Sequence, residues 1–206
     1  MLELKNLHYH PATSEEDVLK GLNLKSVENQ PILIAGASGS GKTSLIEVIS
    51  GLAAQQKGCI NWMGKTLAQR ERRWLCGVVF QFPERYFLGL TVGQELRLGH
   101  RRISTDIQTN ALSKVGLIDL DIRQSPERLS GGQQRRLALA VQLLRQPKVL
   151  LLDEPTAGLD WSVKDDLLSL LSTLAKEQLL IIVTHEPELF KELTNLSYNL
   201  FDGVLV

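Results

Sequence analysis

The sequence predicts an α/β fold: a mainly parallel sheet covered on both faces by helices, with an inserted helical subdomain. Short apolar runs recur along the 206 residues, segments of helical spacing separate them, and the stretch 83–145 is helical in pattern throughout. Strands that alternate with helices favour a parallel sheet. This length suits one substantial core rather than two enzymatic domains. We therefore expect residues 1–206 to form a single domain, with its core in 1–82 and 146–206.

The first half of the chain predicts strands and one helix. Residues 2–9 alternate apolar and polar side chains, as a half-buried strand does. The apolar run 31–35 leads into a glycine-rich turn, and apolar residues after it recur at helical spacing up to Gly51. This pattern indicates a strand, a loop and a helix. Further strands are expected at 22–27 and 76–80, with a hairpin at 59–64 between them.

The second half predicts helices and then two more strands. Within the helical stretch, residues 137–144 are almost wholly apolar, and a second apolar face is formed by Ala111, Leu112, Val115 and Leu117. Apolar strands return at 149–152 and 179–183. A helix over about 162–176 separates them, which again is the alternation typical of a parallel sheet.

Composition narrows the classes of function. Lysine and arginine together number 23, as do aspartate and glutamate, so no overall basic charge draws the chain to nucleic acid or anionic lipid. Cys59 and Cys76 lack the paired spacing of a metal site, and no secretory pattern opens the chain, which favours a reducing, cytosolic setting. No apolar run reaches the roughly 18 residues that a bilayer span needs. At a membrane, the chain would have to dock onto a protein within it.

Residues 36–43 fit the pattern G-x-x-x-x-G-K-[ST] between a buried strand and a helix. Glycines let backbone N–H groups turn inward around phosphate oxygens, and the start of the helix favours an anion. Lys42 is expected to bridge the β- and γ-phosphates of ATP, and Thr43 to ligate Mg²⁺. The alternative is a glycine-rich turn with a solvated lysine, but the pattern arises by chance in only about one chain in a hundred. The expected nucleotide-binding residues here are Gly36, Ala37, Ser38, Gly39, Ser40, Gly41, Lys42, Thr43 and Ser44.

Two acids end the apolar run 149–152. Asp153 and Glu154 are followed by Pro155, which stops the strand. Acids in this position are costly to bury unless a cation meets them, so the pattern indicates either a buried ion pair or Mg²⁺. In a phosphate-loop protein, Asp153 would hold the ion and Glu154 would be free to polarise the attacking water.

The run Leu129-Ser130-Gly131-Gly132-Gln133 precedes a helix. Ser130 can cap that helix, while Gly131 and Gly132 expose N–H groups to an anion without side-chain obstruction. A plain helix cap with a flexible lead-in is the alternative for these five residues alone. With the phosphate loop present, the run through Gln133 resembles the signature of the ATP-binding-cassette (ABC) ATPase family, and it would form a second anion site.

Further motifs follow in that family's order across nearly the whole chain. Gln81 matches its glutamine loop, Gly158-Leu159-Asp160 the loop after the carboxylates, and His185 the switch histidine. The resemblance implies a P-loop NTPase fold: a RecA-like, mainly parallel sheet, an antiparallel β subdomain and the inserted ABC helical subdomain. It also implies ATP and Mg²⁺ as ligands. The residues it implies in catalysis are Glu154, His185, Gln81 and Lys42, with Gln81 also at the metal and Asp160 at the nucleotide.

One position departs from the family's pattern. The family places an aromatic near the end of the first strand to stack on adenine, and Tyr9 is the candidate. An alignment that puts Pro11 at this place would leave stacking to His10, or to Tyr9 indirectly. A core tyrosine on an amphipathic strand is the other explanation.

The stretch 79–84, with Phe87 and Glu95 after it, resembles the cobalt-type and energy-coupling-factor importer ATPases, which serve micronutrients. This resemblance implies a head-to-tail homo- or heterodimer, in which the phosphate loop of one subunit and the signature of the other enclose one ATP. It also implies transmembrane subunits on separate chains, no nucleic-acid partner and a place on the inner face of the membrane. The alternatives are an ABC ATPase of nucleic-acid repair or cluster assembly, and an ATP-regulated binding module, against which the intact Glu154 argues.

An aromatic and apolar cluster follows Gln81 directly and consists of Phe82, Tyr86, Phe87 and Leu88. One interpretation packs these side chains inside the helical subdomain. The other places part of the cluster in a groove for a helix of the transmembrane subunit, since exposed apolar surface beside a moving loop commonly marks a docking site. Thermal unfolding of the chain with a polar residue in place of Phe87 or Leu88 distinguishes the two, because a large loss of stability would indicate a core position.

Overall fold

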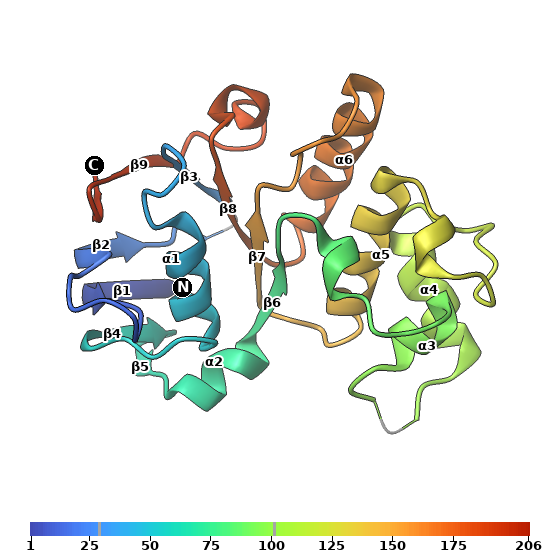
Figure 1. Ribbon diagram of the computed structural model, residues 1–206, viewed down its shortest axis with the longest axis horizontal. Coiled ribbons are helices and arrows are strands. Elements are labelled where there is room, and N and C mark those ends of the chain that lie inside the picture. Colours follow the sequence, from blue (N-terminus) through green and yellow to red (C-terminus); the bar gives the residue numbers. More distant parts are fainter. Residues whose placement is uncertain (29, 101) are drawn as a thin grey trace.

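The computed structural model describes residues 1–28, 30–100 and 102–206. Figure 1 shows the sheets and both chain ends in one half of the molecule and a group of helices in the other. That group contains α3 (Val92–Arg97), α4 (Thr105–Lys114) and α5 (Gly131–Leu143). The predicted α/β class is therefore confirmed.

Six strands form the central sheet: β3 (Ile32–Ala35), β6 (Cys76–Val79), β7 (Val149–Asp153), β8 (Leu179–Thr184), β9 (Ser197–Phe201) and β10 (Val204–Leu205). Their order is β10-β9-β3-β8-β7-β6. β3 pairs in parallel with β8 and β9, and β7 pairs in parallel with β6 and β8. β10 is antiparallel to β9. The sheet is thus mainly parallel, as the alternating pattern predicts.

A second sheet contains β1 (Leu2–Tyr9), β2 (Leu19–Lys25), β4 (Lys57–Trp62) and β5 (Lys65–Thr66). The order is β2-β1-β4-β5, and every pairing is antiparallel. β4 and β5 form the predicted hairpin, with Gly64 at its turn in the left-handed region. This sheet is the antiparallel element that the family resemblance implies.

Both faces of the central sheet are buried. Leu150 and Leu152 of β7 pack in one apolar cluster with residues of α5 and α6, whereas Val149 and Leu151 pack in another with residues of α1. A parallel sheet needs this double cover, and its strands are therefore apolar on both faces. The remaining helices are α1 (Lys42–Ser50), α2 (Gln69–Leu75) and α6 (Trp161–Leu174), together with the 3₁₀ helices η1 (Pro83–Tyr86), η2 (Pro126–Arg128) and η3 (Pro187–Phe190).

Some elements differ from the sequence prediction. β2 begins at Leu19, three residues before the predicted start, because the backbone N–H of Val18 already donates to the carbonyl of Tyr9 at 2.7 Å and starts the pairing with β1. Helix α2 and strands β9 and β10 were not predicted. α2 is a short helix of seven residues, and β9 alternates weakly because only Leu200 on it is fully buried.

Candidate active site

Parallel strands deliver their carboxyl ends to one edge of the sheet, where a cleft of about 550 Å³ lies. The glycine-rich loop follows β3, and Gln81 comes after β6. Asp153 ends β7, Glu154 is next, and His185 follows β8. The cleft is lined by Val18, Ser38, Gly39, Gly41, Lys42, Thr43, Ser44, Gln81, Asp153, Glu154 and His185. Segments from five separate parts of the sequence thus share one concave site.

The glycine-rich loop folds around its own lysine. Gly41, which precedes α1, has a φ of 99°, in the left-handed region that glycine adopts without strain. Lys42 is only 7% exposed, and its Nζ donates hydrogen bonds to the carbonyl oxygens of Gly36 (2.7 Å) and Ala37 (2.9 Å). Within the loop, the Ser40 hydroxyl is buried and has no hydrogen-bond partner among the described residues. A buried cation and an unpaired hydroxyl in one loop suit a phosphate chain.

Asp153 lies beside the start of α1. Its Oδ2 accepts a hydrogen bond from the Thr43 hydroxyl at 2.8 Å. Burial raises the pKa of Asp153, and the neighbouring Glu154 carboxylate adds to the rise, while the Thr43 bond and the charge of Lys42 oppose it. A further cation beside Asp153 would therefore stabilise the ionised form of its carboxylate.

Glu154 connects the lysine and the histidine. Its carboxylate lies 3.7 Å from Lys42 Nζ and 2.8 Å from His185 Nδ1. Its Oε2 also accepts a hydrogen bond from the backbone N–H of His185 at 3.2 Å. The φ of Glu154 is 47°, which is rare for this residue type, and strained backbone of this kind clusters at functional sites. Three of the four predicted catalytic side chains are thus in direct contact, and Gln81 lines the same cleft.

The residues expected to hold Mg²⁺ fit that ion. Thr43, Gln81 and Asp153 all line the cleft and all offer oxygen ligands, which Mg²⁺ prefers. The described part of the chain contains no cluster of three His, Cys, Asp or Glu side chains poised for a metal. Mg²⁺ in nucleotide sites keeps several waters and takes oxygens from the phosphates, so one carboxylate and one hydroxyl suffice.

The signature residues lie outside this cleft. Ser130 caps α5 as predicted: its Oγ accepts from the N–H of Gln133 at 3.3 Å, and the Gln133 side chain accepts from the N–H of Ser130 at 2.9 Å. Neither residue lines the cleft, and nor do Gly131, Gly132 or Asp160. The structure brings together the phosphate loop, both acids, Gln81 and His185, and it leaves the signature separate.

Tyr9 also does not line the cleft. It is partly buried against the core that includes β1 and α1, and burial together with the charge of Glu47 raises the pKa of its hydroxyl. Its stacking on adenine stays a prediction. The sequence reasoning missed Val18, which lines the cleft and is held there by its backbone bond to Tyr9. No sequence signal marks this valine, because its place depends on how β1 pairs with the following segment.

The apolar cluster after Gln81 divides into two groups. Phe87 packs against the core of the helical region, and the Phe82 ring is covered by the Arg85 guanidinium, 4.9 Å from the ring centroid. Tyr86 and Leu88 are 58% and 80% exposed, and Leu90, which was not predicted, is 79% exposed. Phe87 therefore packs in the core as the first interpretation predicts, whereas Tyr86 and Leu88 are exposed and their docking role stays a prediction.

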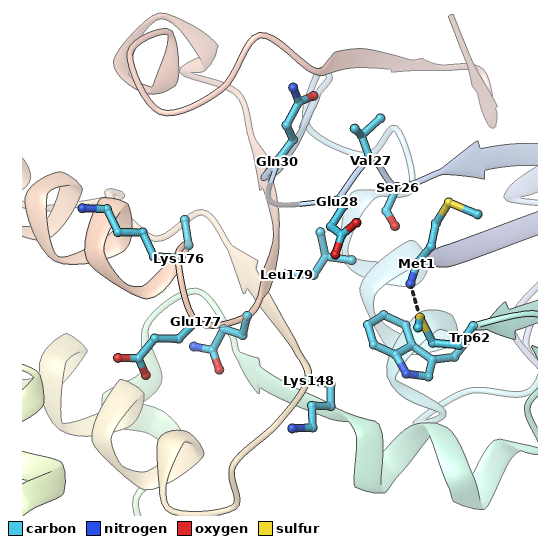
Figure 2. Close-up of a pocket in the computed structure, with 13 residues that line it drawn as sticks. Met1, Ser26, Val27, Glu28, Gln30, Trp62, Lys148, Lys176, Glu177 and Leu179 are labelled. Atoms are coloured by element: carbon cyan, nitrogen blue, oxygen red, sulfur yellow. Dashed lines mark hydrogen bonds between the residues drawn. The ribbon is translucent and has the colours of Figure 1, made fainter.

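A separate cavity of about 370 Å³ lies where β7 and β8 begin, at the opposite end of these strands from the cleft. Figure 2 shows Trp62 and Met1 on one side of it and Lys148 and Lys176 on the other. The N-terminal amine of Met1 donates to Met63 Sδ at 2.8 Å beside it. No residue predicted for phosphate, metal or catalysis lines this cavity.

Comparison with known proteins identifies the family. The family model described as ABC transporter matches residues 19–157. The ABC transporter I family member 11 of Arabidopsis thaliana, a chloroplastic protein, is 36% identical over 222 residues, which cover all of this chain and 80% of that protein. The energy-coupling factor transporter ATP-binding protein EcfA of Methanosphaera stadtmanae is 35% identical over 92% of this chain and 72% of its own length.

A solved structure of an ABC transporter component also matches this chain. CbiO1 of Clostridium perfringens, part of the ABC transporter complex CbiONQ, superposes with a TM-score of 0.88 at 28% identity, over all of this chain and 86% of CbiO1. Within the described residues, no helix is both long and apolar enough to cross a membrane. Fold, cleft, motif order and relatives agree, and the chain belongs to the ABC transporter family as one of its ATP-binding ATPase subunits.

Proposed function

We propose that this ATPase powers a micronutrient importer of the energy-coupling-factor or cobalt type. The observation that carries the proposal is the contact of Lys42, Glu154 and His185 in one cleft with the phosphate loop. The relatives named EcfA and CbiO1 support the choice of importer. In this arrangement residues 83–145 act as the inserted helical subdomain, between core segments 1–82 and 146–206.

The cleft suggests a role for each side chain. Lys42 would leave the carbonyls of its own loop for the β- and γ-phosphates, and Glu154 would orient and polarise the attacking water. His185 and Gln81 would contact the γ-phosphate and so respond to its loss. Mg²⁺, held from the protein side by Thr43, Gln81 and Asp153, would neutralise charge that develops on the phosphates.

The separate position of the signature suggests a dimer. The N–H groups of Gly131 and Gly132 lie at the start of α5, so they can bind an anion, whereas the N–H of Ser130 already donates to Gln133. None of these residues lines the cleft of its own subunit. We infer that they complete the ATP site of a second ATPase subunit, identical or related, with Gln133 and Asp160 at the same interface. The γ-phosphate then joins the two subunits, and its hydrolysis releases them.

The exposed leucines after Gln81 suggest how the chain meets the membrane. Leu88 and Leu90 are about four-fifths exposed on a segment that begins at the cleft, and apolar surface of this kind marks docking sites. We propose that they contact transmembrane subunits on separate chains, which places this subunit at the cytoplasmic face as a peripheral component. ATP turnover would then reach the membrane through this segment.

Leu88→Asn tests the docking surface. The variant should unfold within about 1 °C of the wild-type chain, because this side chain lies largely in solvent, but it should co-purify poorly with the membrane subunits. Ile118→Asn is the matched control, since Ile118 is 67% exposed elsewhere in the helical region. Equal recovery of the membrane subunits by both variants would contradict the docking role of Leu88.

Asp153→Asn tests how far the ionised carboxylate of Asp153 destabilises the nucleotide-free fold. The pKa of Asp153 is raised in the folded chain, so the fold binds this proton more tightly than the unfolded chain does, and ionised Asp153 lowers stability as the pH rises. The variant, free of nucleotide, should therefore unfold about 2–4 °C higher at pH 7, with a smaller difference near pH 5, and MgATP should stabilise it less than wild type. A lower unfolding temperature at pH 7 would argue against this account.

The importer assignment is tested by isolating the native complex and identifying what accompanies the chain. Integral membrane subunits without nucleotide motifs of their own, in a complex that transports only with ATP, would support it. Association with nucleic acid or with cluster-assembly proteins in place of membrane subunits would overturn it.

A further inference from the structure

Arg135 is a buried cation with most of its hydrogen-bonding capacity unused. It lies on α5, four residues after Gly131, and is 3% exposed. Its Nη2 donates to the carbonyl oxygen of Ala157 at 2.8 Å. Its Nε and Nη1 are buried and have no partner among the described residues. Buried N–H groups without an acceptor lower the stability of the fold. Stability alone therefore does not explain why an arginine occupies this position.

Two loops from the nucleotide cleft meet at Arg135. One follows Glu154 and contains Ala157 and Gly158. The other, residues 82–90, follows Gln81. The loops touch each other, since a Cβ placed on Gly158 would lie 3.7 Å from Phe82 Cε1. The 3₁₀ helix η1 of the second loop packs against α5. Arg135 therefore stands where the signature helix, the loop after the catalytic acid and the 82–90 loop converge.

The 82–90 loop enters this junction under strain. Phe82 has a φ of 56°, a left-handed conformation that costs energy for a bulky aromatic residue. Pro83 is buried, whereas Glu84 is exposed. The strained Phe82 directly follows Gln81, which lines the cleft, so the position of this loop is linked to the cleft.

Glu84 is the acid whose charge acts on Arg135. Burial lowers the pKa of the Arg135 guanidinium, and the Glu84 carboxylate opposes this change. Glu84 makes no hydrogen bond or ion pair with the rest of the described chain. A buried guanidinium with two unpaired nitrogens and an exposed, unpaired carboxylate thus lie on two elements that pack together, α5 and η1.

We propose that Glu84 closes onto one edge of the Arg135 guanidinium, formed by Nε or Nη1 together with the second N–H of Nη2, when ATP is bound, so that Arg135 is a positioning residue that fixes the 82–90 loop against the signature helix. This deepens the proposed function and rests on it, because the loop carries the exposed Leu88 and Leu90. A guanidinium presents paired N–H donors that match a carboxylate in two parallel bonds. With the pair formed, the nucleotide cleft, the signature and the docking surface move as one unit.

The chain contains its own matched control for Glu84. The 3₁₀ helices η1 and η2 both begin with Pro-Glu-Arg, and Glu84 and Glu127 are both exposed in the first turn. Glu84→Gln and Glu127→Gln thus remove the same charge from the same local structure. Neither change should shift the unfolding temperature of the nucleotide-free chain by more than about 1 °C.

The experiment measures the MgATP concentration that gives half-maximal dimer, by light scattering, in a Glu154→Gln background that retains ATP. Glu84→Gln should raise this concentration about tenfold, within the usual range for coupling between sites, and should leave the MgADP affinity unchanged. Glu127→Gln should change neither. Arg135→Lys, which keeps the charge and loses the paired donors, should act like Glu84→Gln, and the double variant should be no worse than either single variant.

The proposal would be overturned if Glu84→Gln and Glu127→Gln reach half-maximal dimer at the same MgATP concentration. Additive effects in the double variant would overturn it as well. If Arg135→Lys does not fold, the comparison of the two glutamates decides alone. If the Glu154→Gln chain forms no dimer with MgATP, that result contradicts the proposed ATP site shared between two subunits. The ratio of MgATP to MgADP affinity in single chains then tests the pair: Glu84→Gln lowers this ratio relative to Glu127→Gln if the ion pair forms.

Discussion

Glu154→Gln is expected to bind MgATP as the wild-type chain does and to hydrolyse it at least about a hundredfold more slowly, as loss of a general base would predict. Glutamine keeps the shape of the side chain and can still accept the backbone N–H of His185, but it cannot take a proton from water. Because the γ-phosphate remains, the variant should accumulate as an ATP-bound dimer. Phosphate release and light scattering measure the two effects.

Glu47→Gln is the control for this experiment. Burial and the charge of Asp153 raise the pKa of Glu47, so it is a partly buried acid near the site, yet it does not line the cleft. Its removal should slow hydrolysis less than about fivefold if it serves neither as acid nor as base. Near-wild-type turnover by Glu154→Gln, or an equal loss in both variants, would remove Glu154 from its proposed role.

Mixing two inactive chains should restore activity if each ATP site is shared between subunits. A Lys42→Ala chain lacks the phosphate-loop cation, and a Gly131→Asp chain places a carboxylate at the signature. In a mixed dimer, one site carries both defects and the other carries neither. Random mixing of equal amounts makes half of the dimers mixed, so about a quarter of wild-type activity should return if the sites act independently.

Gly131 is preferred to its neighbour for this test because of packing. A Cβ on Gly132 would lie 2.5 Å from Val163 Cγ1, whereas the nearest atom to a Cβ on Gly131 is Leu159 Cδ2, at 3.7 Å. Substitution at Gly132 would thus disturb the contact between α5 and α6 as well as the anion site. Absence of recovery in a sample where mixed dimers are demonstrated would mean that each subunit completes its own site.

Much of the cleft was predictable because its residues follow the ends of apolar strands. In a parallel sheet the strand ends share one edge, so Lys42, Gln81, Asp153, Glu154 and His185 had to lie near one another once the strands were recognised. The cap formed by Ser130 was equally local. Such features depend on a few consecutive residues and on a simple rule of sheet geometry.

The rest depends on contacts between distant segments. Val18 enters the cleft because of strand pairing, and the separation of Phe87 from Leu88 into core and surface follows from how the 82–90 loop packs on α5. Strand β9 is evident from its pairing with β3 in the structure, whereas its own composition does not mark it as a strand. Arg135 reads as one of several basic residues on a helix, and only its burial distinguishes it.

The strand order also constrains how this protein is made. Strand β3 supports the glycine-rich loop, and its two neighbours in the sheet are β8 and β9, at residues 179–184 and 197–201. A ribosome therefore synthesises more than 140 further residues after β3 before both neighbouring strands are available to support the loop. Until then β3 exposes two unpaired edges and an apolar surface, the condition in which nascent chains aggregate. The growing polypeptide should accordingly depend on chaperones until β8 and β9 emerge, and we expect ATP binding only afterwards.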